Sequence, residues 1–152
     1  MIPVRIAAIG EAEAIARVIN SAFRPAEEFF VESDRISVDG VRALFATGAF
    51  FIAGDYAGAV YVEVRGERAY FGMLAVDPAR QGAGIGRTLI AAVEDYARAH
   101  GSRFMDIRVV DLRTELPPRY RKLGYVETGS EPWPGDVPSK LPCRLLRMEK
   151  TL

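Results

Sequence analysis

The chain has 152 residues, of which 49% are hydrophobic, and its 20 Lys and Arg residues balance its 20 Asp and Glu residues. This length fits one domain, residues 1–152, with a sizeable core. A net charge of zero argues against nucleic acid or an anionic membrane surface as a partner, and no apolar run approaches the ~20 residues of a membrane span. A single cysteine, Cys143, and no signal-peptide pattern lead us to expect a cytoplasmic protein.

The N-terminal part predicts a strand, a helix and an irregular segment. Residues 2–8 alternate apolar and polar side chains, which favours a short strand. The next helix begins near Glu11, carries its apolar face from Ile15 to Phe23, and is expected to end at Pro25. Residues 24–40 are acidic and aromatic with weak periodicity. We expect a surface segment there, followed by a short helix over residues 41–45.

The middle of the chain predicts strands joined by short glycine-containing turns. Connections this short join antiparallel neighbours. In the second of these strands the valines alternate with Tyr61, Glu63 and Arg65, so the two sets should face opposite sides of the sheet. The predicted strands cover residues 49–55, 59–65 and 69–76.

A glycine loop follows the third of these strands and leads into a helix that ends near His100. Gly82, Gly84 and Gly86 alternate directly before or at the start of the helix. Glycine lets a ligand approach the backbone closely, and a helix N-terminus offers free N–H groups and the positive end of its dipole. This combination indicates a site for an anion, most often a phosphate group.

Three classes of glycine loop compete for this segment. A P-loop requires Gly-x-x-x-x-Gly-Lys-Ser/Thr, and the chain has Gln81 and Arg87 at two of the fixed positions. A dinucleotide loop requires Gly-x-Gly-x-x-Gly in the first turn of a doubly wound sheet, and here the spacing is one residue short and follows antiparallel strands. Asp111 could act as the ribose-binding acid, so the dinucleotide class is weakened but stays open.

The C-terminal part predicts a crossover, a short helix and a final pair of strands. Residues 103–110 form a strand that is reached through a helix, so it should lie parallel to residues 69–76 in a right-handed crossover. The pair Pro117-Pro118 suits the first turn of a short helix that Gly124 ends. Residues 129–141 are rich in Pro, Gly and Ser and predict a long loop over the sheet edge. The last strand covers residues 144–150.

Two segments resemble motifs of the GCN5-related N-acetyltransferase (GNAT) superfamily. Gln81-x-x-Gly84-x-Gly86 is similar to its acetyl-CoA loop, Gln/Arg-x-x-Gly-x-Gly/Ala. Tyr120-x-x-x-Gly124-Tyr125 is similar to its Tyr-x-x-x-Gly-Phe/Tyr segment. The resemblance spans about residues 2–150. It implies an α/β (α+β) fold: a mixed, mostly antiparallel sheet of six to seven strands, flanked by helices on both faces, with a central parallel pair splayed for the coenzyme.

The resemblance also implies a function and a set of site residues. It implies an N-acetyltransferase that moves the acetyl group of acetyl-CoA to a primary amine of a small molecule or peptide, through a tetrahedral intermediate. Tyr120 matches the position of the general acid that protonates the leaving thiolate. The implied coenzyme site consists of Leu74, Ala75, Val76, Gln81, Gly82, Ala83, Gly84, Ile85, Gly86, Arg87, Thr88 and Tyr120. The implied acceptor side, with residues 24–40 as its variable part, includes Phe29, Phe30, Tyr61 and Trp133.

The sequence does not decide which residue acts as the general base. Some members of the family place a Glu on the strand before the loop, but residues 69–76 contain no carboxylate. Glu63 on the neighbouring strand is therefore the candidate, acting directly or through water together with Tyr61 or backbone carbonyls. No cluster of His, Cys and carboxylate residues has the spacing of a metal site, so we expect no metal. The acidic side chains between Glu27 and Asp34 suit a cationic amine.

Other functions remain compatible with these patterns. A non-catalytic acyl-CoA sensor would keep the fold and bind the coenzyme without turning over an amine. A nucleotide-binding oxidoreductase would bind NAD(P) instead. Trp133, between two prolines, could pack the loop instead of binding the acceptor. A homodimer through an exposed edge strand near the C-terminus is common in the family that the chain resembles.

Overall fold

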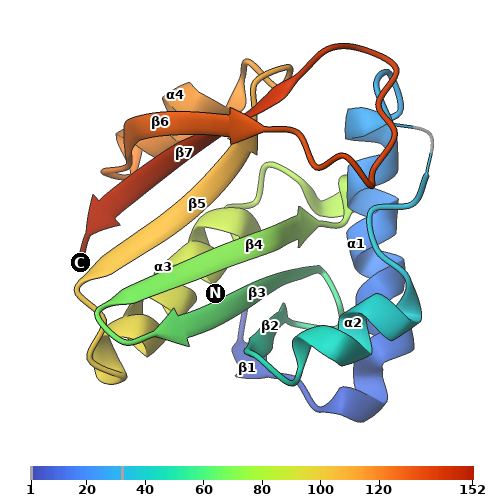
Figure 1. The fold of residues 1–152 in the computed structure, drawn as a ribbon. Coiled ribbons are helices and arrows are strands. Elements are labelled where there is room, and N and C mark those ends of the chain that lie inside the picture. Colours follow the sequence, from blue (N-terminus) through green and yellow to red (C-terminus); the bar gives the residue numbers. More distant parts are fainter. Residues whose placement is uncertain (1, 32) are drawn as a thin grey trace.

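The computed structural model describes residues 2–31 and 33–152. Its seven strands form one sheet in the order β1-β2-β3-β4-β5-β7-β6 (Figure 1). The strands are β1 Val4–Ile6, β2 Ala49–Ala53, β3 Gly58–Arg65, β4 Arg68–Val76, β5 Phe104–Val110, β6 Val126–Pro132 and β7 Arg144–Thr151. The helices are α1 Ala12–Glu27, α2 Val38–Leu44, α3 Ile85–Ala99 and α4 Leu116–Lys122, with 3-10 turns at Ile9–Glu11 and Pro78–Arg80.

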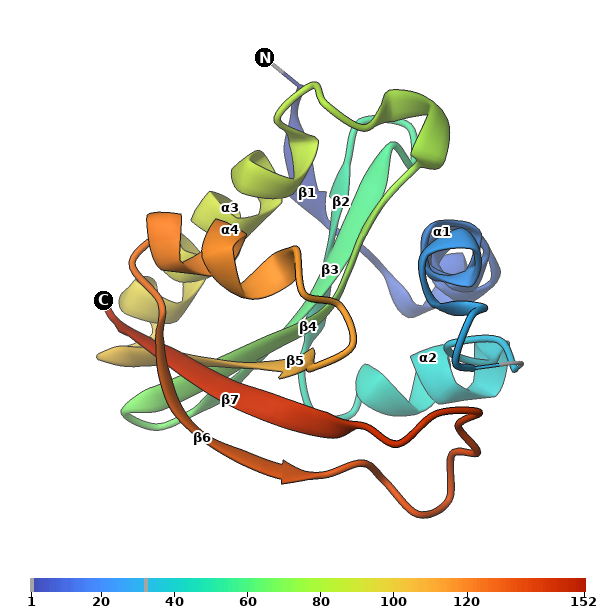
Figure 2. The same cartoon turned by 90° about the horizontal axis from the view of Figure 1, so that it is seen from above.

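Helices cover both faces of the sheet, with α3 and α4 on one side and α1 and α2 on the other (Figure 2). Each pair of helices closes its own core. Leu89 and Val93 of α3 pack with valines of β3, whereas Ile15 and Ile19 of α1 pack with Tyr61 of β3. The predicted alternation of β3 is confirmed. The face that carries Tyr61 is covered rather than exposed, because α1 and α2 lie over it.

The central strands β4 and β5 are parallel, as the crossover through α3 predicts. They pair only from Arg68 with Phe104 to Tyr70 with Asp106, although β4 continues to Val76 and β5 to Val110. The same part of β4 contains a bulge against β3, where Met73 takes the left-handed conformation with φ 56. A bulge bends its strand and increases the local twist. The implied splay of the parallel pair is confirmed.

The first helix runs past the proline at which it was expected to end. Pro25 lies inside α1, which continues to Glu27, and Glu28 N–H still donates to Arg24 O over 2.9 Å. Proline lacks one N–H, so in the last turn it removes one hydrogen bond without ending the helix. Ala22 and Glu27 are buried on the same helix, and this packing holds its last turn in place.

The end of the chain also differs from the prediction. Strand β6 continues to Pro132, so residues 129–132 belong to a strand and not to a loop. Proline has no N–H to donate. An edge strand tolerates it, because the N–H groups on one side of an edge strand have no neighbouring strand to bond with. The loop that follows packs against the segment after α1 rather than over the sheet edge: Lys140 N–H donates to Phe30 O over 2.6 Å, and Lys140 Nζ donates to Glu28 O over 3.0 Å.

None of the helices in the described ranges is long and apolar enough to cross a membrane.

Candidate active site

The glycine loop presents bare backbone to solvent between β4 and α3. Gly82 and Gly84 take left-handed conformations with φ 88 and 78, which glycine adopts without steric cost. A Cβ added to either would meet nothing within 4 Å. Gly84 is the N-cap of α3 and no side chain caps the helix, so the N–H groups of its first turn are left for a ligand. This donor set fits the pyrophosphate of a coenzyme.

The neighbouring residues fix the loop in place. Asp77 accepts a hydrogen bond from Ala79 N–H over 2.9 Å, and Gln81 Nε2 donates to Val76 O over 3.4 Å. Ile85 is 3% exposed and anchors the first turn of α3 in the core. Thr88 donates to Gly84 O over 2.9 Å. The other loop residues that the resemblance implied, Ala83 and Arg87, are exposed, and Gly86 is half-buried.

The last residues of β4 have a free backbone edge beside this loop. Ala75 and Val76 pair with Ala59 and Gly58 of β3, but on the other side of β4 the ladder with β5 has already ended at Tyr70. On that side β5 does not pair with Leu74, Ala75 or Val76, and Gln81 Nε2 donates a long hydrogen bond of 3.4 Å to Val76 O, so this edge offers backbone groups to an extended ligand. An extended chain that adds to a strand edge is a common binding mode. The implied coenzyme residues thus lie along one continuous path from β4 to α3.

Tyr120 of α4 lies on the α3 face of the sheet. Its ring centroid is 6.2 Å from that of Phe71 and 5.9 Å from that of Tyr125. Its hydroxyl makes no hydrogen bond within the described ranges. Burial raises the pKa of Tyr120 to about 12, against the lowering effect of Arg113 and Arg119. The phenol is therefore protonated at neutral pH and can donate its proton to a ligand in the gap between β4 and β5.

The second sequence motif has a clear structural reason for its glycine. Gly124 takes φ 100, and its N–H donates to Arg121 O over 3.0 Å as α4 ends. This turn directs Tyr125 into the core, where it is 0% exposed and donates to Glu94 Oε2 over 2.7 Å. The motif therefore orients Tyr120 and Tyr125 together.

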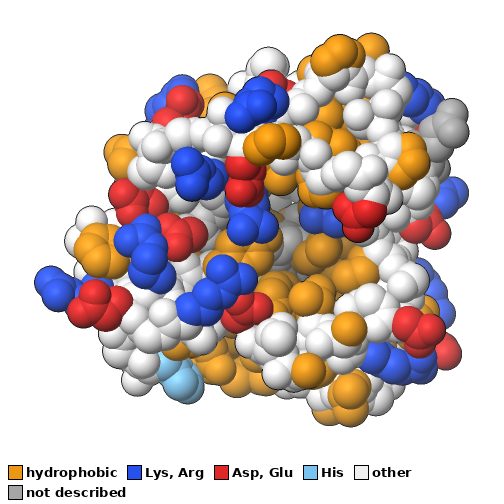
Figure 3. All heavy atoms as spheres, in the orientation of Figure 1, with side chains coloured by type: hydrophobic (Ala, Val, Ile, Leu, Met, Phe, Trp, Pro, Cys, Tyr) orange, Lys and Arg blue, Asp and Glu red, His pale blue; other side chains and the backbone are white. Residues whose placement is uncertain are grey.

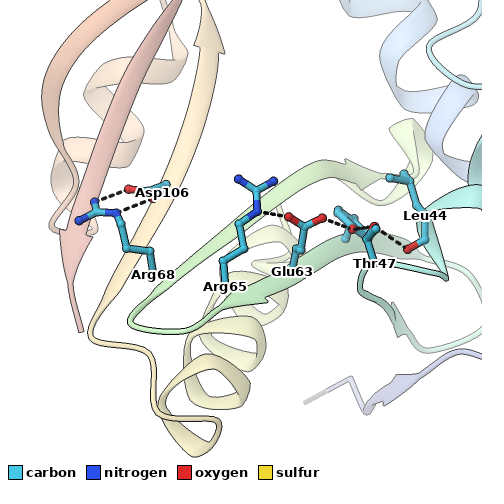
Figure 4. Close-up of polar contacts among 7 residues, drawn as sticks. Leu44, Thr47, Glu63, Arg65, Arg68 and Asp106 are labelled. Carbon is cyan, nitrogen blue, oxygen red and sulfur yellow. Dashed lines mark hydrogen bonds and ion pairs between the residues drawn. The ribbon is translucent and has the colours of Figure 1, made fainter.

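Tyr61 and Glu63 lie on the opposite face, under α1 and α2. The Tyr61 hydroxyl donates to Glu63 Oε1 over 2.8 Å and lies 2.6 Å from Thr47 Oγ1, and Arg65 Nε also donates to Glu63 (Figure 4). Burial acts to raise the pKa of Glu63, but the hydrogen bonds from Tyr61 and Arg65 outweigh it and lower the pKa. Burial and Glu63 raise the pKa of Tyr61 to about 12. Glu63 is thus an ionised carboxylate and a weak base.

A hollow lies between the two halves of the molecule on the α1 and α2 side, with apolar side chains on its floor (Figure 3). The side chain of Tyr70 lies along β4, where a Cβ on Gly72 would collide with its hydroxyl. The guanidinium carbons of Arg65 and Arg108 lie 5.7 and 5.4 Å from the centroid of the Tyr70 ring. Arginine stacks readily on aromatic rings, and here Arg65 also pairs with Glu63 and Arg108 with Glu131 over 2.7 Å.

Three of the four aromatic residues assigned to the acceptor side, Phe29, Phe30 and Trp133, form one cluster, whereas Tyr61 packs with Phe50 and Tyr70. The ring of Phe30 lies 4.7 Å from that of Phe29 and 5.9 Å from that of Trp133. Phe30 is 0% exposed and Phe29 is 50% exposed. Trp133 Nε1 donates to Val137 O over 2.7 Å. The cluster joins the end of α1 to the loop after β6, and its part in binding an acceptor stays a prediction.

The sequence analysis missed an ion pair near these aromatic residues. Glu27 is 9% exposed, and its Oε2 lies 3.4 Å from Nη1 of Arg113, which follows β5. Arg113 also contacts Glu115 over 3.1 Å. Burial raises the pKa of Glu27, against the lowering effect of Arg113 and Arg35. Nothing in the sequence marks Glu27 among its acidic neighbours, although Arg113 follows a parallel strand, where site residues often gather.

A pocket of about 290 Å³ lies beside this ion pair. Its lining includes Phe23, Arg24, Glu27, Glu28, Arg35 and Lys140. Arg24 pairs with Asp34, so Asp34 and Glu27, two of the acidic residues expected to attract a cation, already have arginine partners. Glu32 belongs to the same predicted acidic stretch and lies outside the described residues. Within the described ranges no group of three or more His, Cys, Asp or Glu residues could hold a metal ion.

Comparisons with known proteins agree with this geometry. The family model of the acetyltransferase (GNAT) domain matches residues 26–138. A sequence search of curated proteins finds no match.

Solved structures share the fold at low sequence identity. yncA from Salmonella typhimurium, solved with its cofactor acetyl-CoA, is 21% identical with a TM-score of 0.77, covering 100% of this chain and 94% of that chain. The ribosomal-protein-S18-alanine N-acetyltransferase of Escherichia coli is 16% identical with a TM-score of 0.79, covering 99% and 94%. Nourseothricin acetyltransferase is 21% identical with a TM-score of 0.74, covering 99% and 98%. By its fold, its glycine loop and the match over residues 26–138, the chain belongs to the GNAT acetyltransferase family.

Proposed function

We propose that the protein transfers the acetyl group of acetyl-CoA directly to a primary amine. One observation carries the proposal: the parallel strands β4 and β5 separate after Tyr70 and Asp106, beside an uncapped helix N-terminus. The free edge of β4 and the free N–H groups of α3 together suit a ligand with an extended arm and a pyrophosphate. Coenzyme A has both parts, and membership of the family supports acetyl transfer.

In the proposed site, the chain holds the donor along β4 and α3. The N–H groups of residues 83–87 bind the pyrophosphate, with Gln81, Arg87 and Thr88 at the mouth of the loop. Leu74, Ala75 and Val76 pair through their backbone with the pantetheine arm. When bound, acetyl-CoA supplies a thioester carbonyl that an amine can attack. Binding both reactants in one cleft supplies much of the rate increase, because it removes the entropic cost of bringing them together.

The proposed reaction needs one proton donor and one proton acceptor. The amine nitrogen forms a C–N bond to the thioester carbonyl carbon, backbone N–H groups stabilise the charge on its oxygen, and the C–S bond then breaks. Tyr120 donates its phenolic proton to the departing thiolate. The proton lost by the amine travels through water and finally restores the Tyr120 phenol. The products are the N-acetylated amine and coenzyme A with a free thiol.

Glu63 is proposed as an intermediate acceptor in this water relay, which takes up the amine proton and gives it back to water before the Tyr120 phenol is restored. Its carboxylate lies beside Tyr61 on β3, on the face of the sheet that α1 and α2 cover. Because its pKa is lowered, it accepts a proton weakly, and the relay rather than direct abstraction fits its environment. The absence of a carboxylate from β4 supports a second candidate function, a non-catalytic acyl-CoA sensor with the same fold.

Thermal-shift titration with acetyl-CoA, CoA and NAD(P)H tests the binding part of the proposal. A ligand that binds only the folded state raises the melting temperature. We expect a shift with acetyl-CoA and CoA and none with NAD(P)H; the reverse would assign the glycine loop to the dinucleotide class. Thiol release with a panel of amines then separates the enzyme from the sensor, because a sensor binds CoA but releases no thiol above background. A cytoplasmic location and a homodimer stay predictions.

A further inference from the structure

The pocket beside the end of α1 contains Arg35, for which the described part of the chain provides no ion-pair partner. The guanidinium carbon of Arg35 lies 5.6 Å from the ring centroid of Phe23, and both residues line the 290 Å³ pocket. Within residues 2–31 and 33–152 no carboxylate forms an ion pair with Arg35. An exposed arginine fixed against an aromatic ring keeps five N–H donors in a planar fork, which is the geometry that binds a carboxylate with two hydrogen bonds.

The other charged groups around the pocket are already engaged or lie at its rim. Arg24 pairs with Asp34, and Glu27 pairs with Arg113. Lys140 Nζ donates to Glu28 O over 3.0 Å, and the Glu28 side chain is exposed. Of the two arginines that line the pocket, Arg35 is therefore the one that pairs with no carboxylate of residues 2–31 and 33–152.

The charge of Arg35 also acts on a side chain of the cleft in which the reaction would occur. Its charge acts on both Glu27 and Tyr70, lowering the pKa of each against the raising effect of burial. The Tyr70 ring is flanked by Arg65 and Arg108. Both of these arginines form ion pairs, Arg65 with Glu63 and Arg108 with Glu131 over 2.7 Å. Arg35, which pairs with no carboxylate of residues 2–31 and 33–152, is therefore the arginine of this region to which an anionic group can bind.

We propose that the acceptor is a free amino acid or a close analogue, whose carboxylate binds Arg35 while its amine extends past Tyr70 toward the gap between β4 and β5. This inference rests on the proposed acetyl transfer. A volume of 290 Å³ lies at the lower end of the range for small-molecule sites, ~300–1,000 Å³. It suits a molecule of amino-acid size and excludes a folded protein surface from the pocket itself.

The test compares acceptors that differ only in the carboxylate. Each of the common L-amino acids is assayed by thiol release with saturating acetyl-CoA, beside its carboxamide and its decarboxylated amine. We expect kcat/KM for at least one acid to be about tenfold or more above the values for its carboxamide and its decarboxylated amine. This is the size of effect that follows when a charged group loses its hydrogen-bonding partner. Equal rates for the acid, the amide and the amine would overturn the proposal.

The variant Arg35→Gln tests whether Arg35 is the group that binds the carboxylate. We expect it to raise KM for the preferred acid about tenfold, to change kcat much less, and to leave the rate with the matching amide unchanged. Arg98→Gln, on the far helix α3, is the matched control and should leave KM within about twofold. An equal rise in KM for acid and amide would overturn the assignment to Arg35.

A binding measurement separates this inference from the proposed acetyl transfer. The CoA-saturated protein is titrated with the same amino acids and amides in a thermal-shift assay. A shift that needs the carboxylate and disappears in Arg35→Gln supports the carboxylate site even where no amine is acetylated, in which case the proposed catalysis fails alone. CoA binding with no shift for any acid would refute the carboxylate site.

Discussion

Tyr70 and Asp106 are the last residues at which β4 and β5 face each other in register. Beyond them the two strands continue without pairing, and β4 bends at the bulge around Met73. The gap therefore arises inside the sheet rather than between separate layers. The tyrosine proposed as the acid, Tyr120, lies on one face of this gap, and the open hollow lies on the other.

Tyr120→Phe removes the proposed proton donor and little else, since its hydroxyl has no partner in the described part of the chain. We expect kcat to fall by about 10²-fold or more at neutral pH, the lower range for loss of a general acid. Steady-state kinetics give kcat, and CoA titration should show affinity within about twofold of the parent. An unchanged kcat would remove Tyr120 from the mechanism.

The raised pKa of Tyr120 also predicts a stability change in alkali. Its folded pKa of about 12 lies above the value of about 10 in the unfolded chain, so the folded state holds this proton more tightly. That stabilisation is complete below pH ~10 and is lost as the pH rises toward about 12. Urea unfolding between pH 8 and 12 should show a smaller alkaline loss in Tyr120→Phe than in the parent.

Gly84→Ala tests the left-handed N-cap of the glycine loop. Alanine at φ 78 costs roughly 1–2 kcal/mol, so the loop either loses stability or moves its N–H groups. We expect acetyl-CoA affinity to fall about tenfold or more by calorimetry. Gly86→Ala is the control: Gly86 lies inside α3, its added Cβ would be 3.6 Å from Val76 Cγ2, and alanine favours a helix by about 0.5–1 kcal/mol. Equal losses in both variants would contradict the loop assignment.

Glu94→Ala should destabilise the α3 side of the protein. Glu94 is 6% exposed, accepts a hydrogen bond from Tyr125 over 2.7 Å and pairs with Lys150 over 3.0 Å. Removing one partner of a buried ion pair costs about 3–5 kcal/mol, because it leaves the other charge uncompensated. Lys150 is partly exposed, so we expect the lower end of this range by urea unfolding. Glu13→Ala, on the exposed side of α1, should stay within about 0.5 kcal/mol of the parent.

The lowered pKa of Glu11 predicts part of the loss of folding stability in acid. Hydrogen bonds from Arg5 and Tyr56 lower its pKa from 4.5 to about 2. A lowered folded pKa gives stability that is present above pH 4.5 and lost as the pH falls toward about 2. Melting temperatures between pH 2 and 7 should show a smaller acid loss in Glu11→Gln than in the parent. The control Asp95→Asn alters a carboxylate that is 80% exposed and should leave the acid profile unchanged.

Local patterns in the sequence were sufficient for most of the fold. The alternation around Tyr61 and the short turns predicted the antiparallel strands, and the glycine loop with its helix predicted the parallel crossover. The insertion of β7 between β5 and β6 was not predicted, because it depends on pairings such as Met105 with Lys150 that no local pattern encodes. The ribbon in Figure 1 shows this order clearly.

The candidate site was predictable where it lies on a motif and not where it depends on contacts distant in sequence. The coenzyme loop and Tyr120 were assigned from motifs that resemble those of the family, and their roles stay predictions. The pair of Glu27 with Arg113 joins residues 86 positions apart, and proline at position 25 hid the last turn that carries Glu27. Arg35 appeared as an ordinary surface charge until the structure placed it in the pocket beside Phe23.

The hydrogen bond between Lys140 and Phe30 joins the segment after α1 to the loop after β6, so each of these two irregular segments helps to hold the other in position. The backbone of Lys140 is bonded to Phe30, and the buried Phe30 ring rests on Trp133. If only one of these segments were exchanged for that of a relative, Phe30 would lose its packing against Trp133. The hydrogen bond between Lys140 and Phe30, which holds the other segment, would also be lost. A change to residues 28–37 therefore requires a matching change to residues 133–143.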